Sequence, residues 1–317
     1  MIAETGEPMI VNLGEAFFNN LKFDEQSLKK YRIEAALRCA ETLGSKPAVC
    51  LSGGADSQAT VQCWNEAGLD FDVVIGVFKD GLNKHDTDHA KQFCKTYKIP
   101  YKELEINITQ LLARDNFSIS EKYKSYSPHF NVHYRMVEML ADLGYTGTCF
   151  GGVNPFMRNG EFGNNFQGAI FHFLKIQHLL PIPMQGSFLS FSPELAWAIG
   201  LLCKDVEHET LTDSRHQSGL DFLNKLRYEE KVKSFARAGI KVIPQETKYT
   251  GFELVKEYYA SKTNDGWEFE KRFRHPIAKQ FLTDKTQEYK FLIKNEVKDI
   301  IDLIYLNNSR SFVRPPT

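Results

Sequence analysis

The stretch that most constrains the fold lies at residues 48–57, where a short apolar run ends in Ser-Gly-Gly-Ala-Asp-Ser. Helical spacing of apolar residues follows directly, over residues 58–67. Gly53 and Gly54 allow a tight turn with positive φ and a close approach of a ligand to the backbone. The first N–H groups of a helix have no partners inside it and lie at the positive end of its dipole. The stretch therefore predicts a strand, a glycine turn and a helix start that together bind phosphate.

The hexapeptide Ser52–Ser57 resembles the SGGxDS signature of the PP-loop ATP pyrophosphatases, the adenine nucleotide alpha hydrolase-like superfamily. This superfamily includes asparagine synthetase, GMP synthetase, NAD synthetase, the tRNA thiolation enzymes and the preQ0 synthases, with the PAPS reductases as relatives. The resemblance implies cleavage of ATP between its α and β phosphates. A carbonyl or carboxylate oxygen is adenylated, pyrophosphate leaves, and a nitrogen or sulfur nucleophile displaces AMP. A plain glycine turn capped by Ser or Asp is the structural alternative.

Each residue of the motif has a predicted role in binding ATP. The backbone of Gly53 and Gly54 and the hydroxyls of Ser52 and Ser57 donate to phosphate oxygens. Asp56 differs, because a carboxylate among phosphates is repulsive unless a cation lies between them. We therefore expect Asp56 to be a Mg²⁺ ligand and a catalytic residue. The sequence contains no Walker A motif, which is the other common phosphate-binding loop.

The elements around the motif predict an α/β fold with a doubly wound parallel sheet. Strands are expected at residues 48–51, 72–78, 101–106 and 146–150, with helices between them. Residues 72–78 are a near-continuous apolar run, and residues 101–106 alternate in part. Residues 115–130 are expected to be irregular and polar. Ligands of such sheets bind beyond the carboxyl ends of the strands, which is where the glycine turn falls.

The chain divides into three predicted regions. Residues 1–45 form an N-terminal lead-in and helix, 46–160 a PP-loop ATP-binding domain, and 161–317 a mostly helical substrate region. Within the last region, helical periodicity is clearest at residues 219–238 and 288–306.

Further nucleotide contacts follow from the resemblance. The end of the second strand, Val77 and Phe78, matches the position of the adenine pocket in the superfamily. Gly151, Gly152 and Asn154 resemble a second glycine turn whose backbone lies near the nucleotide. Phe78 could equally be a core residue, and Gly-Gly and Asn-Pro are also common in ordinary turns.

Four basic residues are candidates for contacts with anions. Arg135 and Arg158 are expected to bind the acceptor substrate, since a guanidinium can hold a carboxylate or phosphate with two hydrogen bonds. Lys248 and Arg274 are the expected catalytic cations that stabilise the departing pyrophosphate. For each of the four, a solvated or ion-paired surface position is the alternative.

Histidine and cysteine patterns favour no metal site. His85 and His89, like His129 and His133, are four residues apart, but helix capping by Asp86 or Thr87 explains the first pair better. The six cysteines are widely spaced without a C-x-x-C motif, which indicates reduced thiols. That absence counts against tRNA thiolation and preQ0 synthesis, and it favours nitrogen transfer.

The composition limits the kinds of molecule that the protein is expected to bind. Lysine and arginine number 39 against 40 aspartate and glutamate, which argues against a broad nucleic-acid-binding face, although a local RNA contact stays open. The N-terminus does not resemble a signal peptide, and no long apolar run predicts a membrane span. We expect a cytoplasmic enzyme with a small-molecule substrate, with a homodimer as an option.

The sequence thus predicts an ATP-dependent ligase that adenylates its substrate, releases pyrophosphate and transfers nitrogen, as asparagine synthetase does. ATP and Mg²⁺ are the expected cofactors. Ile2 follows the initiator methionine where an N-terminal glutaminase would need cysteine, so ammonia or an amine must come from elsewhere. A sulfurtransferase or PAPS reductase-like enzyme is one alternative, and a non-catalytic nucleotide-binding protein is another.

Overall fold

The computed structural model describes residues 20–125, 127–151, 155–158, 161–164, 176–186, 191–192, 194–195, 198–199, 229, 231–245, 252–260, 272–273, 275–276 and 312–313. At their centre is a five-stranded sheet with the order β3-β2-β1-β4-β7, in which every pairing is parallel. Its strands are β1 (Pro47–Cys50), β2 (Asp72–Phe78), β3 (Tyr101–Ile106), β4 (Gly147–Phe150) and β7 (Met184–Gln185). The predicted parallel α/β fold is confirmed.

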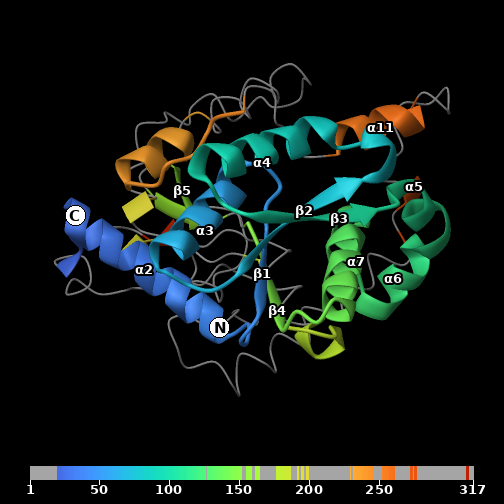
Figure 1. Cartoon of the computed structure of the whole chain (residues 1–317), viewed down its shortest axis with the longest axis horizontal. Helices are drawn as coiled ribbons and strands as arrows, with labels where there is room; N and C mark the ends of the chain where they lie inside the picture. The colour runs from blue at the N-terminus through green and yellow to red at the C-terminus, as the bar shows by residue number, and fades with distance from the viewer. Residues whose placement is uncertain are drawn as a thin grey trace.

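Helices cover both faces of this sheet (Figure 1). On one face lie α2 (Glu25–Glu41), α3 (Ala55–Glu66) and α4 (Lys84–Tyr97), and on the other lie α6 (Asn116–Tyr123), α7 (Pro128–Asp142) and α11 (Glu253–Ala260). Alternate residues of β1 enter the two cores: Val49 belongs to the first and Ala48 to the second. Because both faces are buried there, β1 and β2 are near-continuous apolar runs, whereas the edge strand β3 has four exposed residues.

Short elements complete the described chain. A 3-10 turn η1 (Lys79–Gly81) follows β2, while α5 (Ile108–Gln110) and a π-turn η2 (Leu111–Asp115) lead into α6. A second 3-10 turn, η3 (Gln177–Leu179), precedes β7. A separate antiparallel sheet has the order β5-β6-β8, from β5 (Pro155–Arg158), β6 (Glu161–Asn164) and β8 (Phe312–Val313).

Two local expectations were wrong. Residues 115–130 are not irregular, because α6 and the start of α7 fall there, with Ser127 capping α7 through its hydroxyl and Pro128 in the first turn. The strand β7, which pairs with β4, was not predicted, since two residues directly after Pro183 carry no strand pattern. The predicted helix at 288–306 lies outside the described residues, and the three-region division stays a prediction.

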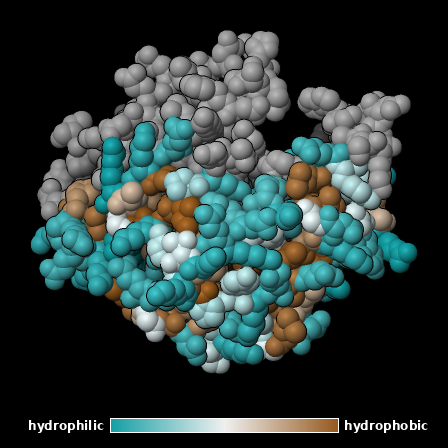
Figure 2. Space-filling view, turned by 45° about the horizontal axis from the view of Figure 1, so that its top comes forward, coloured by the Kyte–Doolittle hydropathy of each residue, from teal (hydrophilic) through white to brown (hydrophobic). Residues whose placement is uncertain are grey.

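The described surface is mostly hydrophilic on the face shown in Figure 2, and its hydrophobic residues form scattered patches. Among the described residues, no helix combines the length and the apolar character needed to cross a bilayer.

Candidate functional site

The Ser-Gly-Gly turn connects the carboxyl end of β1 to the first residue of α3, as predicted. Gly53 has a φ of 84°, and a Cβ atom at this position would lie 2.5 Å from the carbonyl oxygen of Asp86 in α4. No side chain fits at a distance that short, and the positive φ independently favours glycine. Glycine at this position lets the turn lie flat against the start of the neighbouring helix.

The two serines of the motif stabilise the turn. The Ser57 hydroxyl accepts from the Ser52 N–H at 3.2 Å, lies 3.2 Å from the Ser52 hydroxyl, and donates to the Gly54 carbonyl at 2.9 Å. Ser57 is buried and Ser52 is exposed, so only Ser52 presents its hydroxyl to solvent. The N-cap residue of α3 is Gly54, which has no side chain to cap the helix. The first turn of α3 therefore offers backbone N–H groups to an anion.

A second glycine from β4 closes the other side of the turn. β4 runs beside β1, with Phe150 in register with Cys50. A Cβ atom on Gly151 would lie 2.6 Å from the Ser57 backbone nitrogen. The structure thus brings Gly151 against the loop Ser52–Ser57, while Gly152 and Asn154 lie outside the described residues.

A pocket of about 210 Å³ opens beside this turn, at the carboxyl ends of β1, β2 and β4. Ser52 and Gly151, from the two glycine turns, line it. Its apolar walls come from β2, α7, the end of β4 and the residue before α11, and they include Val74, Phe78, Val132, Met136, Phe150 and Phe252. The start of α4 adds polar residues, Asn83, Asp86 and Thr87. A partly apolar pocket beside an uncapped helix start has a layout that suits a nucleotide.

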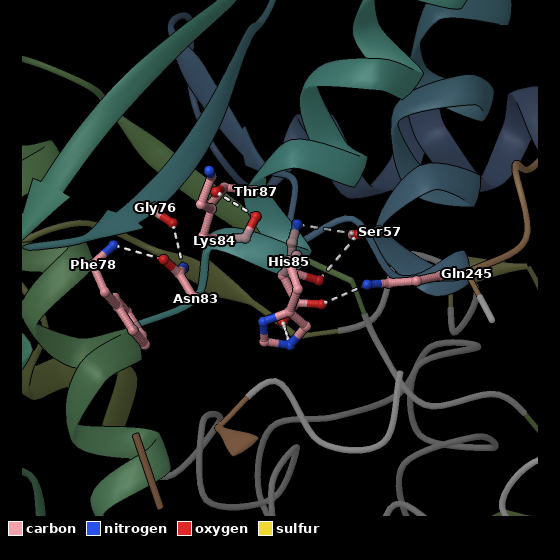
Figure 3. Close-up of polar contacts among 10 residues, drawn as sticks. Ser57, Gly76, Phe78, Asn83, Lys84, His85, Thr87 and Gln245 are labelled. Atoms are coloured by element: carbon pink, nitrogen blue, oxygen red, sulfur yellow. Dashed lines mark hydrogen bonds and ion pairs between the residues drawn. The ribbon is translucent and has the colours of Figure 1, made fainter. Parts of the chain in front are cut away.

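The end of β2 contributes Phe78 to this pocket. Its ring packs edge-on against Phe252, with 5.7 Å between the centroids, and its N–H donates to the Asn83 side chain at 2.8 Å. Asn83 also donates to the Gly76 carbonyl at 2.8 Å, as Figure 3 shows. Val77 instead packs into the core on the opposite face of the sheet. The side chains at the two predicted adenine positions therefore face opposite ways.

His133 of α7 also lines the pocket, with its ring centroid 4.7 Å from that of Phe150. Burial lowers the pKa of His133 to about 4, so the ring is neutral near pH 7. In the sequence, the one notable feature of His133 is its spacing of four residues from His129. A neutral imidazole in the pocket wall adds hydrogen-bonding capacity without adding charge.

The Asp56 carboxylate, the predicted Mg²⁺ ligand, forms an ion pair with Lys231. The Lys231 ammonium lies 3.0 Å from Asp56 Oδ2, and both side chains are partly exposed. The other carboxylate oxygen, Oδ1, is buried and has no hydrogen-bond partner among the described residues. The lysine beside the loop is therefore Lys231, a residue that the sequence does not single out.

Lys231 belongs to a segment, residues 231–245, that binds the starts of α3 and α4. The Gln58 side chain accepts from the Ile243 N–H at 2.6 Å and donates to the Ile243 carbonyl at 2.9 Å and to the Gly53 carbonyl at 2.7 Å. His89 lies 2.9 Å from the same Ile243 carbonyl. Gln58 thus joins the backbone of the loop to the backbone of the segment.

Arg32 of α2 holds the middle of the same segment, at Ala238. Its guanidinium contacts both carboxylate oxygens of Glu66, at 2.7 and 2.8 Å, and donates to the Ala238 carbonyl. Residues Phe235, Ala238 and Ile240 complete the core on this face. Part of the segment therefore packs on the same face of the sheet as α2, α3 and α4, and its first residue, Lys231, lies at the loop.

Of the four predicted anion-binding cations, Arg135 is the one whose side chain the structure describes. Arg135 forms an ion pair with Glu138 at 3.1 Å, and its side chain is 45% exposed. The described walls of the pocket do not include it. The Arg158 side chain, Lys248 and Arg274 lie outside the described residues, so their roles stay predictions.

The predicted cap of α4 was wrong: its N-cap residue is Asn83, so Asp86 and Thr87 lie inside the helix and do not cap it. His89 contacts Ile243, and His85 lies 3.6 Å from the Asp86 carboxylate. No group of three potential metal-ligating side chains occurs among the described residues. The five described cysteines are buried free thiols, and Cys39 and Cys149 have their sulfurs 3.9 Å apart. Burial raises the pKa of Cys50, in the pocket wall, to about 12.

Two solved structures share a general likeness with this chain. One is the U34-tRNA thiolase NcsA of Methanococcus maripaludis with its 4Fe–4S cluster: 13% identity, 89% of this chain and 90% of that chain covered, TM-score 0.34. The other is the NMN synthetase of Francisella tularensis: 12% identity, 78% and 98% covered, TM-score 0.35. No protein-family model matches the sequence, and no curated protein matches it significantly. The parallel sheet, with the Ser-Gly-Gly turn at the carboxyl end of its central strand, is the fold that the resemblance to the PP-loop superfamily implies.

Proposed function

We propose that this protein is a PP-loop enzyme that cleaves ATP to AMP and pyrophosphate while it adenylates a small-molecule substrate. The observation that supports this most directly is the packing around Ser52–Ser57. Two glycines that tolerate no side chain, Gly53 and Gly151, flank the uncapped start of α3. Backbone donors and an apolar pocket then meet at the sheet's carboxyl edge, which suits a nucleotide.

In this proposal the phosphates and the base occupy opposite ends of the pocket. The β and γ phosphates bind to the backbone N–H groups at the start of α3 and to the Ser52 hydroxyl. The base lies between Phe78 and the side chains of α7. A substrate oxygen attacks the α-phosphorus in line, and pyrophosphate leaves from the loop. The protein contributes chiefly by positioning the reactants and stabilising charge.

Lys231 is the cation best placed to assist the departing pyrophosphate. Its ammonium is already at the loop, 3.0 Å from Asp56, and its flexible side chain can turn toward a phosphate oxygen. Lys248 and Arg274 stay candidates for the same task. We further propose that ammonia or an amine displaces AMP from the adenylated substrate.

A Mg²⁺ ion fits this site in one respect. Asp56 has one buried carboxylate oxygen without a hydrogen-bond partner among the described residues, and Mg²⁺ commonly binds one or two carboxylates together with substrate phosphates. Asp56 is the residue that would hold the ion, which would supply charge neutralisation for the pyrophosphate. Lys231 would then be released from Asp56, which agrees with its proposed movement to the phosphates.

The test is product identification. The full chain is incubated with ATP, Mg²⁺ and a panel of carboxylate and amine acceptors, and the nucleotides are separated by chromatography. We expect AMP and pyrophosphate in equal amounts, and at least a roughly hundredfold loss of rate in Asp56→Ala. ADP and phosphate as products would overturn the mechanism, as would full activity in Asp56→Ala. ATP binding without turnover on any acceptor would instead indicate a nucleotide-binding protein.

A further inference from the structure

One charged residue in the pocket has no role in the function proposed so far. Asp86 lies in the first turn of α4, is only 4% exposed, and lines the pocket. A carboxylate in this position repels phosphate and attracts hydrogen-bond donors. Its presence beside a phosphate-binding turn therefore indicates that the ligand presents donors there.

The contacts of α4 show which part of a nucleotide meets Asp86. Asn83, just before the helix, binds the end of β2, where the base is expected. The Asp86 backbone lies against Gly53 of the phosphate loop. Asp86 and Thr87 thus line the pocket between its base end and its phosphate end. In a nucleotide, the group between the base and the phosphates is the ribose.

The carboxylate is held in a defined orientation. Gln245 donates to Asp86 Oδ1 at 3.1 Å, and His85 Nε2 lies 3.6 Å from Asp86 Oδ2 (Figure 3). A carboxylate can accept about four hydrogen bonds, so Asp86 can bind a ligand while its neighbours hold it. Gln245 is itself buried. The residues around Asp86 thus fix the direction in which it can accept.

We propose that Asp86 accepts hydrogen bonds from the ribose hydroxyls of the bound nucleotide, and that it selects ribonucleotides over deoxyribonucleotides. The 2′ and 3′ hydroxyls are neutral donors on adjacent carbons, and an oriented carboxylate is the side chain that binds such a diol best. Gln245 is a positioning residue that brings the C-terminal part of the chain into this selection. The inference rests on the proposed function, since it takes ATP as the ligand.

The test compares ATP with 2′-deoxyATP and 3′-deoxyATP by isothermal titration calorimetry on the full chain. We expect the wild-type protein to bind ATP roughly ten- to a hundredfold more tightly than at least one deoxy analogue, as for a hydrogen bond to a charged group. In Asp86→Ala this ratio should fall to near one, with an intermediate ratio in Asp86→Asn, which keeps the side chain's size. Gln245→Met should lower the ratio severalfold.

Asp88→Asn serves as the matched control, because Asp88 is an exposed carboxylate on the same helix. Its ratio should equal that of the wild type, and thermal unfolding checks that every variant is folded. Equal binding of ATP and both deoxy analogues by the wild type overturns the ribose assignment, as does an unchanged ratio in folded Asp86→Asn and Asp86→Ala. A wild-type protein that binds none of the three nucleotides overturns the proposed function itself.

Discussion

The site combines two regions that differ in how the sequence encodes them. The loop Ser52–Ser57 takes its shape from residues within a few positions of one another, with Ser57 bonded to Ser52 and Gly54. The segment 231–245 reaches the same place from 175 residues away, through Lys231 and Asp56. The loop offers backbone N–H groups. The segment contributes the Lys231 ammonium, which pairs with Asp56, and the Gln245 amide, which donates to Asp86.

This contrast shows that a recognisable motif is only half of the site. Two carboxylates at neighbouring helix starts, Asp56 and Asp86, are both contacted by the segment, one by the Lys231 ammonium and one by the Gln245 amide. A cation beside Asp56 suits a position facing phosphates. A neutral amide beside Asp86 leaves that carboxylate's charge in place.

The largest effect is expected from adding a side chain at Gly53. Gly53→Ala should abolish ATP binding and lower the free energy of unfolding by roughly 2–5 kcal/mol, because its Cβ meets the Asp86 carbonyl and its φ is positive. Gly68→Ala is the control, since Gly68 also has a positive φ but has no atom within 4 Å of the place that a Cβ would occupy. It should cost only about 1–2 kcal/mol in chemical denaturation. Equal losses in the two variants would show that backbone strain, and not packing against α4, shapes the loop.

The next effect tests the link between the two regions. Gln58→Met should lower the free energy of unfolding by about 3 kcal/mol, because the buried Gly53 carbonyl and the Ile243 amide lose their partner, while the Ile243 carbonyl keeps His89. Hydrogen exchange should rise at residues 240–245 while the strands stay protected. Gln62→Met, one turn later in α3, removes a glutamine whose side-chain nitrogen has no partner among the described residues. A comparable loss in that control would contradict a specific link.

The smallest effect on stability should come with a clear effect on activity. Lys231→Met removes a partly exposed ion pair, so the free energy of unfolding should change by less than about 1 kcal/mol. The rate of pyrophosphate release should nevertheless fall at least roughly tenfold, because the departing pyrophosphate loses the cation proposed to assist it. Lys241→Met, at an exposed lysine of the same segment, should leave both quantities unchanged. An unaltered rate in Lys231→Met would remove this lysine from the mechanism.

The fold of the first half could be predicted because its signals are local. The apolar runs of β1 and β2 and the glycine turn between β1 and α3 are each set by adjacent residues. The short strand β7 could not be predicted, since only its pairing with β4 makes it a strand. Likewise α6 is polar outside and becomes helical through its packing on α7.

The site was predictable to the same extent. Ser52, Gly53 and Gly151 come together as the motif and the strand order imply. Lys231, Gln245 and Phe252 could not be assigned, because no sequence spacing links them to the distant residues that they contact. Residue type alone favoured Lys248 and Arg274. Gln58 is fully buried among the polar residues at the start of α3, and its need for a partner becomes visible only in the structure.

The link between Gln58 and Ile243 has a consequence for the order of events during synthesis. The two residues are 185 positions apart, so the loop leaves the ribosome long before the segment that holds it. At about 5–20 residues per second, the interval is roughly ten to forty seconds. During that time the nascent chain carries the phosphate-binding motif without Lys231 or Gln245. Under the proposed assignment of Asp86, nucleotide selectivity is therefore acquired only after the segment 231–245 has emerged.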